Sequence, residues 1–328
     1  MKSKVVRIGT RGSELALWQA QWVQRELCER FKRLKVTVEI IKTKGDKVLD
    51  SPLSKIGSKG LFTKEIEQAL LAEEIDLAVH SLKDLPTELP QGLTIAAICE
   101  REDVRDVFIP HPGNPEKRLL RQPEGAKIAT GSLRRRCQLL NRRPDFQIMD
   151  IRGNLTTRLK KLDESDWAGI VLARAGIVRL GRTDRIGETI DADVILPAVG
   201  QGALAIEIRS GDIRIESLVS VLHDWNTAQA ALAERALLRR LEGGCQIPVG
   251  TFGTVVLNDS GEQELILSAM VGSLDGKTII RGRTHGNPVD AEALGEELAE
   301  TLLRGGAEKI LSTIRASAPK QISEQVEV

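Results

Sequence analysis

A cysteine in a glycine-rich turn is the first residue that could do chemistry. Cys245 follows Gly243 and Gly244 and precedes Pro248, which keeps the chain from re-entering a helix. Paired glycines adopt dihedral angles that are closed to other residues, so this loop could present the sulfur from a tight turn. The alternative is a helix C-cap followed by a small buried hydrophobe, because free cysteines are commonly buried. Spacing alone leaves both interpretations open.

An acid beside a base follows a predicted buried strand at residues 75–79. His80, Ser81, Lys83 and Asp84 come directly after it. Ligands bind at the carboxyl ends of strands in α/β sheets. There, a lysine next to an ionised, partly desolvated aspartate could hold an anionic group and stabilise a developing cation. The alternative is a surface turn with solvated charges, and His80 alone is typical of a structural histidine.

Arginines recur where predicted strands give way to helices. Arg11 precedes a helix that Ser13 could cap, an arrangement suited to a carboxylate or a phosphate. Further arginines follow the predicted strands 127–129, 146–151 and 169–173; they are Arg134, Arg135, Arg136, Arg152, Arg158, Arg174 and Arg179. Single arginines are commonly solvated. Convergence on one sheet edge favours instead a ligand with several carboxylates, each suited to a bidentate guanidinium.

Alternating strands and helices position these residues and predict an α/β protein of two lobes. Predicted strands lie at residues 5–8, 36–41, 75–79, 94–99, 107–110, 127–129, 146–151 and 169–173, with helices between several of them. The charged segment 101–106 and the proline- and glycine-containing segment 196–202 would carry the chain between the lobes, leaving a cleft.

A loop at about residues 42–60 has no periodicity of its own and is predicted to be functional or mobile. Lys55 and Lys59 in this loop, with Phe62 after it, are consistent with a lid over an anionic ligand. Phe62 could equally be the first core residue of the helix predicted at 63–72.

The pattern changes after residue 222. Helices are predicted at 213–222, 227–241, 291–303 and 307–314, and strands at 249–257, 264–271 and 278–283 form an antiparallel meander. We therefore expect domain 1 at residues 1–102 and 200–222, domain 2 at 103–199, and a smaller α+β domain 3 at 223–316 with a three-stranded sheet. Residues 317–328 are expected to form a disordered tail.

Composition excludes several classes of partner. The chain has 328 residues, 41% of them hydrophobic, with 47 Lys and Arg against 46 Asp and Glu, so its net charge of +1 gives no reason to expect nucleic acid or a membrane. The 4 cysteines are far apart without metal-ligand spacing, which predicts neither a metal site nor disulfides. The absence of a signal core or a long apolar run predicts a cytoplasmic protein. Without a large exposed apolar pattern, we expect a monomer.

Seven motifs, in order over nearly the whole chain, resemble the porphobilinogen deaminase (hydroxymethylbilane synthase) family. They are Thr10-Arg11-Gly12-Ser13 with Leu15-Ala16-Leu17-Trp18-Gln19-Ala20, Lys59-Gly60-Leu61-Phe62-Thr63-Lys64-Glu65, Ala78-Val79-His80-Ser81-Leu82-Lys83-Asp84-Leu85-Pro86, Ser132-Leu133-Arg134-Arg135, Arg152-Gly153-Asn154, Leu196-Pro197-Ala198-Val199-Gly200-Gln201-Gly202 and Leu241-Glu242-Gly243-Gly244-Cys245-Gln246-Ile247-Pro248.

The resemblance implies a three-domain transferase of periplasmic-binding-protein-like architecture in tetrapyrrole and heme biosynthesis. It would join four porphobilinogen molecules head to tail, releasing ammonia each time, and then release hydroxymethylbilane by hydrolysis. Cys245 would hold a dipyrromethane cofactor through a thioether, and Asp84 matches the catalytic aspartate. A fixed carboxylate there would stabilise the cationic pyrrole that forms when the ring attacks an azafulvene.

Pyrrole acetates and propionates would explain the arginines. Residues that match cofactor-binding positions are Ser13, Ser81, Lys83, Thr130, Ser132, Arg134, Arg135, Arg152 and Gly153. Residues that match substrate-binding positions are Arg11, Lys55, Lys59, Phe62, Arg158 and Arg179. Two departures are Gly131, where many relatives have serine, and Arg174, where relatives usually carry a small or apolar residue.

Two other functions stay open. The chain could be a non-enzymatic two-lobed binding protein for a small polycarboxylate, with Cys245 incidental. Alternatively, Cys245 could be an acyl-transfer nucleophile activated by a histidine. The candidate bases are His80, His111, His223 and His285, none of them near Cys245 in the sequence.

Overall fold

The computed structural model describes residues 5–43, 63–241 and 247–317. Lys55, Lys59, Phe62 and Cys245 lie outside the described residues, as do nearly all of the predicted loop and residues 318–328 of the predicted tail. Ser317, which the sequence analysis assigned to the tail, is helical, so that part of the prediction is wrong.

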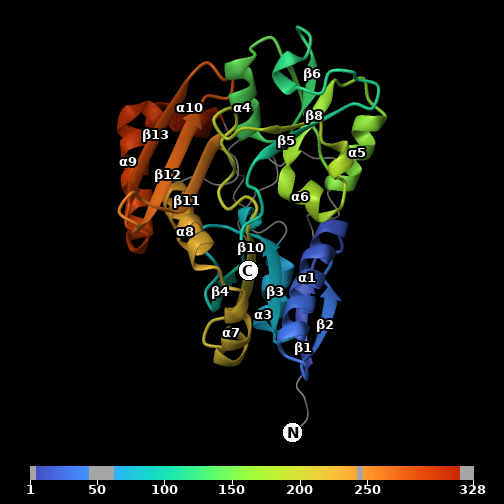
Figure 1. Cartoon of the computed structure of the whole chain (residues 1–328), viewed down its shortest axis with the longest axis vertical. Coiled ribbons are helices and arrows are strands. Elements are labelled where there is room, and N and C mark those ends of the chain that lie inside the picture. Colours follow the sequence, from blue (N-terminus) through green and yellow to red (C-terminus); the bar gives the residue numbers. More distant parts are fainter. Residues whose placement is uncertain (1–4, 44–62, 242–246, 318–328) are drawn as a thin grey trace, which may run out of the picture.

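The first lobe is built on a five-stranded sheet of order β2-β1-β3-β10-β4 in the lower part of Figure 1. Its strands are β1 (Val5–Thr10), β2 (Lys35–Ile40), β3 (Leu77–Ser81), β4 (Leu93–Ile98) and β10 (Leu204–Arg209). Only β10 runs against its neighbours β3 and β4. Helices α1 (Glu14–Arg30) and α7 (Ile213–Val219) share one core with the sheet, whereas α3 (Lys64–Leu71) packs a separate cluster against it.

The second lobe repeats this plan with the order β7-β6-β8-β5-β9. Its strands are β5 (Asp106–Pro110), β6 (Lys127–Ala129), β7 (Gln147–Met149), β8 (Gly169–Ala173) and β9 (Glu188–Ile190), and its helices are α4 (Leu133–Arg142), α5 (Leu155–Asp163) and α6 (Arg174–Arg179). The strands β6, β7 and β8 are parallel, so the helices that follow them begin at one edge of the sheet. Here β5 is the strand antiparallel to β8.

Two segments connect the lobes side by side. The amide of Glu102 donates to the carbonyl of Gly202 at 3.3 Å, and the Gln201 side chain donates to the carbonyl of Val104 at 2.7 Å. Gly202 has φ of +91°, and a Cβ there would lie 2.4 Å from the Glu102 carbonyl oxygen. This close approach of two backbones therefore requires glycine.

The third unit is a three-stranded antiparallel sheet covered by helices, on the left of Figure 1. It contains β11 (Val249–Leu257), β12 (Gln263–Gly272), β13 (Ile279–Gly286), α8 (Trp225–Arg240), α9 (Ala291–Leu302) and α10 (Glu308–Ser317). Two α/β lobes with a smaller α+β unit are the fold class that the sequence predicts. The last strand runs on to Gly286, beyond its predicted end.

A buried carboxylate joins the third unit to both connecting segments. Glu234 of α8 accepts two hydrogen bonds from the Arg101 guanidinium, at 2.7 and 3.1 Å. It also accepts from the amides of Gly200 at 2.7 Å and Gly253 at 2.8 Å. One fully buried side chain therefore holds the first segment, the second segment and β11 together.

Among the described residues, no helix is long and apolar enough to cross a membrane. Within the same residues, no group of three or more His, Cys, Asp or Glu side chains is placed to hold a metal ion.

Candidate active site

The end of β3 and the start of α1 form one wall of the candidate site. Ser81 ends β3, and Lys83 and Asp84 follow in a single 3-10 turn. On α1, the Ser13 hydroxyl caps the helix by accepting from the amide of Ala16 at 3.3 Å, as the sequence predicts. A small pocket brings Ser13, Ser81 and Asp84 together, whereas Lys83 is not part of its lining. The polar residues that line it are Arg11, Ser13, Gln19, Thr63, His80, Ser81 and Asp84.

Gln19 is a part of this wall that sequence reasoning missed. Its side chain is 3% exposed and donates to the Ser81 hydroxyl at 2.8 Å. The sequence signal for Gln19 is its place in Trp18-Gln19-Ala20, where an amide side chain falls on the buried face of the helix. By contrast, Asp84 is exposed to solvent although it lines the pocket, and the predicted partial desolvation of its carboxylate stays a prediction.

The opposite wall comes from the second lobe, where α4 and α5 begin at adjacent strand ends. Ser132 caps α4 by accepting from the amide of Arg135 at 3.4 Å, and Asn154 caps α5 by accepting from the amide of Thr157 at 2.8 Å. Thr130 is 4% exposed, and its hydroxyl accepts from the amide of Ser132 at 3.3 Å.

Two arginines in the first turn of α4 are neutralised in part by a protein carboxylate. Asp106 accepts from Arg134 Nη1 at 2.9 Å and from Arg135 Nε and Nη2 at 3.0 and 2.8 Å. Gln201 Nε2 also donates to Asp106, at 2.8 Å. Burial alone would raise the pKa of Asp106, but the two guanidinium charges and their hydrogen bonds outweigh burial and lower that pKa. The sequence predicted a carboxylate ligand for these arginines and did not identify Asp106 as their partner.

One carboxylate cannot balance the whole cationic cluster. Nε of Arg134 is buried without a hydrogen-bond partner among the described residues. Burial lowers the pKa of Lys83 to about 8, and the positive charge of Arg135 contributes to this shift. Burial, again with Arg135, lowers the pKa of Arg158 to about 10. Lys83 of one lobe and the arginines of the other thus lie in a single electrostatic field that favours added anions.

The remaining predicted residues lie around this cluster. Arg152 is half-buried with its Nε 3.6 Å from Asp150 Oδ2, and the Gly153 carbonyl accepts from Arg158 Nε at 2.8 Å. Arg179 reaches the first lobe, where its Nη2 donates to the Gly202 carbonyl at 2.6 Å and its guanidinium lies 5.7 Å from the centre of the Trp18 ring. It therefore ties the lobes together as well as bordering the cleft.

Both departures from the family pattern have a local cause. A Cβ at Gly131 would lie 2.6 Å from the carbonyl oxygen of Ile151, so a side chain at this position would require the backbone to shift. Arg174 Nη1 lies 3.2 Å from Glu102 Oε1, and its Nε lies 3.6 Å from Asp103 Oδ2. The extra charge of Arg174 is thus paired with the first connecting segment.

The four histidines have hydrogen-bond partners. His80 lies 3.1 Å from Glu207 and His285 lies 2.8 Å from Glu264, while Nδ1 of His111 and of His223 each accept from a backbone amide. The prediction of a structural His80 is consistent with this pairing. The acyl-transfer alternative depends on Cys245, which lies outside the described residues.

Comparisons with known proteins agree along the whole chain. Residues 6–217 match the family model "Porphobilinogen deaminase, dipyromethane cofactor binding domain", and residues 228–304 match "Porphobilinogen deaminase, C-terminal domain". Porphobilinogen deaminase from Chlorobaculum parvum is 55% identical over 318 residues, which cover 96% of this chain and 99% of that protein. The protein of the same name from Syntrophotalea carbinolica is 51% identical over 314 residues, covering 96% of this chain and 97% of its own.

Among solved structures, the L-cystine solute receptor of Neisseria gonorrhoeae in its unliganded open conformation is similar at 13% identity. Its TM-score is 0.39, and the match covers 67% of this chain and 86% of that chain. At this score the likeness supports no statement about function.

Proposed function

Because the chain belongs to the porphobilinogen deaminase family, we propose that it joins four porphobilinogen molecules head to tail, releases ammonia at each step and finally releases hydroxymethylbilane. Its family places it among the transferases that use a dipyrromethane cofactor. The observation that carries the proposal for this chain is the cationic cluster between the lobes, which faces Asp84.

The residues of the cleft fit a dipyrromethane carrying several carboxylates. Arg134 has a buried Nε without a partner in the described structure, and Arg135 shares Asp106 with it, so positive charge remains in excess. Carboxylates would satisfy both the orphan donor and the excess charge. The proposed cofactor contacts are Ser13, Ser81, Lys83, Thr130, Ser132, Arg134, Arg135, Arg152 and Gly153, and the proposed covalent anchor is Cys245.

When bound, the cofactor supplies the pyrrole carbon to which the first substrate is joined. The side chains of the protein orient the substrate and stabilise the charge that develops on it. Arg11, Arg158 and Arg179 would hold substrate carboxylates, together with Phe62, Lys55 and Lys59 outside the described residues. Asp84 would face the pyrrole nitrogens and stabilise the positive charge that develops there, because a fixed carboxylate needs little reorganisation during the step.

We further propose a division into domain 1 (residues 1–102 and 200–222), domain 2 (103–199) and domain 3 (223–316). The paired connecting segments between the two α/β sheets support this division. A cytoplasmic location and a monomeric state stay predictions from the sequence, as does the absence of nucleic-acid and membrane partners.

The intact mass of the purified chain tests the cofactor assignment. We expect an adduct equal to two linked pyrrole rings on the wild-type chain and none on Cys245→Ser. Cys28→Ser is the matched control and should keep the adduct, since Cys28 lies on α1 and is not the predicted anchor. An unmodified wild type, expressed where the cofactor can assemble, would refute the assignment. Ammonia release from porphobilinogen separates the enzyme from a binding protein, which would release none.

A further inference from the structure

A histidine and two acids form a buried cluster behind the strand that leads to Asp84. His80 of β3 has its Nε2 3.1 Å from Oε2 of Glu207 on β10, and these side chains are 6% and 0% exposed. Glu67 of α3 is 6% exposed. Helix α3 packs on both β3 and β10, so the three side chains come from three elements that meet on one face of the sheet.

The cluster holds more carboxylate oxygen than it has donors. Oε1 of Glu207 and Oε1 of Glu67 are both buried without a hydrogen-bond partner among the described residues. Two ionised carboxylates in this position would carry a large desolvation cost, whereas a proton on one of them removes a charge and adds a donor. Burial raises the pKa of Glu67, and the negative charge of Glu207 raises it further.

Among the residues that the structure describes, no lysine or arginine charge acts on Glu67; His80 lowers the pKa of Glu67, but burial and Glu207 outweigh it. The charged groups that act on it are Glu207 from β10, His80 from β3 and Glu65 from its own helix. Strand β4 has no titratable side chain. The remaining cations of the packed strands are Arg209 of β10, bonded to the Leu70 and Ile75 carbonyls, and Arg7 of β1, bonded to Asp76; both lie at the other end of α3.

The cluster also borders the candidate site. His80 precedes Ser81 in β3 and lines the same pocket as Asp84. Ile66, the neighbour of Glu67 on α3, lines this pocket as well. A change in how α3 packs against β3 would therefore displace residues of the wall that carries Asp84.

We propose that Glu67, Glu207 and His80 form a positioning cluster, in which Glu67 is the protonated acid and holds α3 against β3 behind Asp84. The positioning of Asp84 rests on the proposed function, whereas the proton on Glu67 does not. The folded chain binds this proton more tightly than the unfolded chain does. Its contribution to stability is therefore present at acidic pH and is lost as pH rises through the folded pKa of Glu67.

The test uses Glu67→Gln, a neutral side chain of nearly the same shape as the protonated acid. Unfolding by urea and the pH profile of kcat are measured on the full chain with its cofactor. We expect wild type and variant to unfold alike at acidic pH. Between the unfolded and the folded pKa of Glu67, the ratio of their unfolding constants should change by up to about tenfold per pH unit in favour of the variant, and above the folded pKa it should level off. Both Glu67→Gln and Glu67→Ala should lack the alkaline decline, because neither carries the carboxyl, but Glu67→Ala should be less stable at every pH since it also leaves a cavity.

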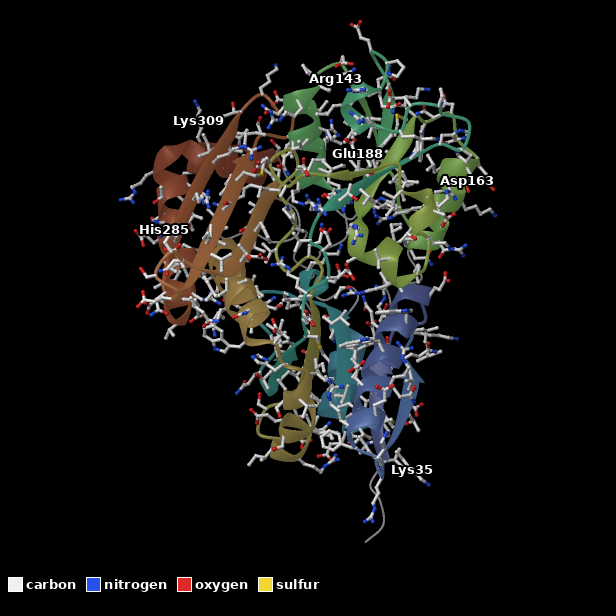
Figure 2. All side chains as sticks on the ribbon, in the orientation of Figure 1. Lys35, Arg143, Asp163, Glu188, His285 and Lys309 are labelled. Atoms are coloured by element: carbon white, nitrogen blue, oxygen red, sulfur yellow. The ribbon has the colours of Figure 1, made fainter. Side chains whose placement is uncertain are left out.

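A second variant and a matched control keep the test decisive. In Glu207→Gln, the charge that helps to keep the proton on Glu67 is gone, so the alkaline decline should move to lower pH. Glu264→Gln alters a histidine–glutamate pair of 2.8 Å that is exposed, with His285 at the outer edge of the third unit in Figure 2, and should change neither profile.

An unfolding profile of Glu67→Gln that follows the wild type at every pH would overturn the proposal. If the two unfolding profiles agree but the wild type releases ammonia normally, the proposal for Glu67 fails while the proposed function stands. Conversely, a wild type that releases no ammonia would refute the proposed function, while the unfolding measurement would still decide the protonation of Glu67.

Discussion

Asparagine has nearly the same shape as aspartate, but Asp106→Asn should lower the free energy of unfolding far more than most substitutions between side chains of like shape. Each carboxylate oxygen of Asp106 accepts two hydrogen bonds: Oδ2 from Arg134 and Arg135, and Oδ1 from Arg135 and Gln201. Whichever oxygen becomes an amide nitrogen loses both bonds and turns a donor toward donors. The only carboxylate shown to accept from these two guanidinium groups loses its charge at the same time.

The magnitude follows from these contacts. Removing one partner of a buried ion pair costs about 3–5 kcal/mol, because the other charge stays buried without compensation. We therefore expect the free energy of unfolding of Asp106→Asn to fall by about 4 kcal/mol, which is roughly a thousandfold change in the unfolding constant. Since Arg134 and Arg135 would also lose their fixed orientation, the fraction of chain carrying the cofactor adduct should fall.

Urea unfolding at neutral pH measures the loss, and Asp103→Asn is the control. Asp103 pairs with Arg105 at 2.7 Å, but these side chains are 21% and 41% exposed. Exposed pairs contribute only about 0–1 kcal/mol. If Asp106→Asn lost no more stability than Asp103→Asn, the reasoning that Asp106 fixes the two arginines would be refuted.

Two further predictions concern the wall formed by the first lobe. Asp84→Asn should keep the cofactor adduct but lower ammonia release by roughly 10²–10³-fold, since it removes a fixed charge that acts on the transition state; unimpaired release would contradict its assigned role. Lys83, with a pKa lowered by burial to about 8, should lose its charge as pH rises through that value, so acquisition of the cofactor by the apoprotein should slow there. In Lys83→Arg this slowing should disappear, and an unchanged pH dependence of cofactor acquisition would exclude Lys83 as its source.

The local part of the site could be predicted from the sequence. Ser13 and Asn154 cap their helices as expected, because a capping side chain and its helix lie within a few residues of each other. The arginines after β6, β7 and β8 gather at one edge, because parallel strands end together. These inferences needed only spacing and the geometry of a sheet.

Contacts between distant segments could not be predicted in this way. Asp106 stood in a charged run that resembled solvated linker, and only the folded chain brings Arg134, Arg135 and Gln201 onto it. Glu207 lies in an apolar strand, where its pairing with His80 has no local signal. Gly131 departs from the serine of many relatives without a local signal, because the limiting factor is the Ile151 carbonyl that approaches it from another strand end.

The junction at Glu234 has a mechanical consequence. A rotation of one lobe against the other about the paired connecting segments displaces atoms in proportion to their distance from that axis. Because Glu234 is bonded to Arg101 and Gly200 on these segments, helix α8 is fastened where such displacement is smallest. The chain continues from α8 directly toward Cys245. The third unit is thus attached at the junction of the connecting segments and also to the first lobe, where Arg235 of α8 donates to the carbonyls of Leu85 and Pro86, so α8 would follow the wall that carries Asp84 in any such rotation.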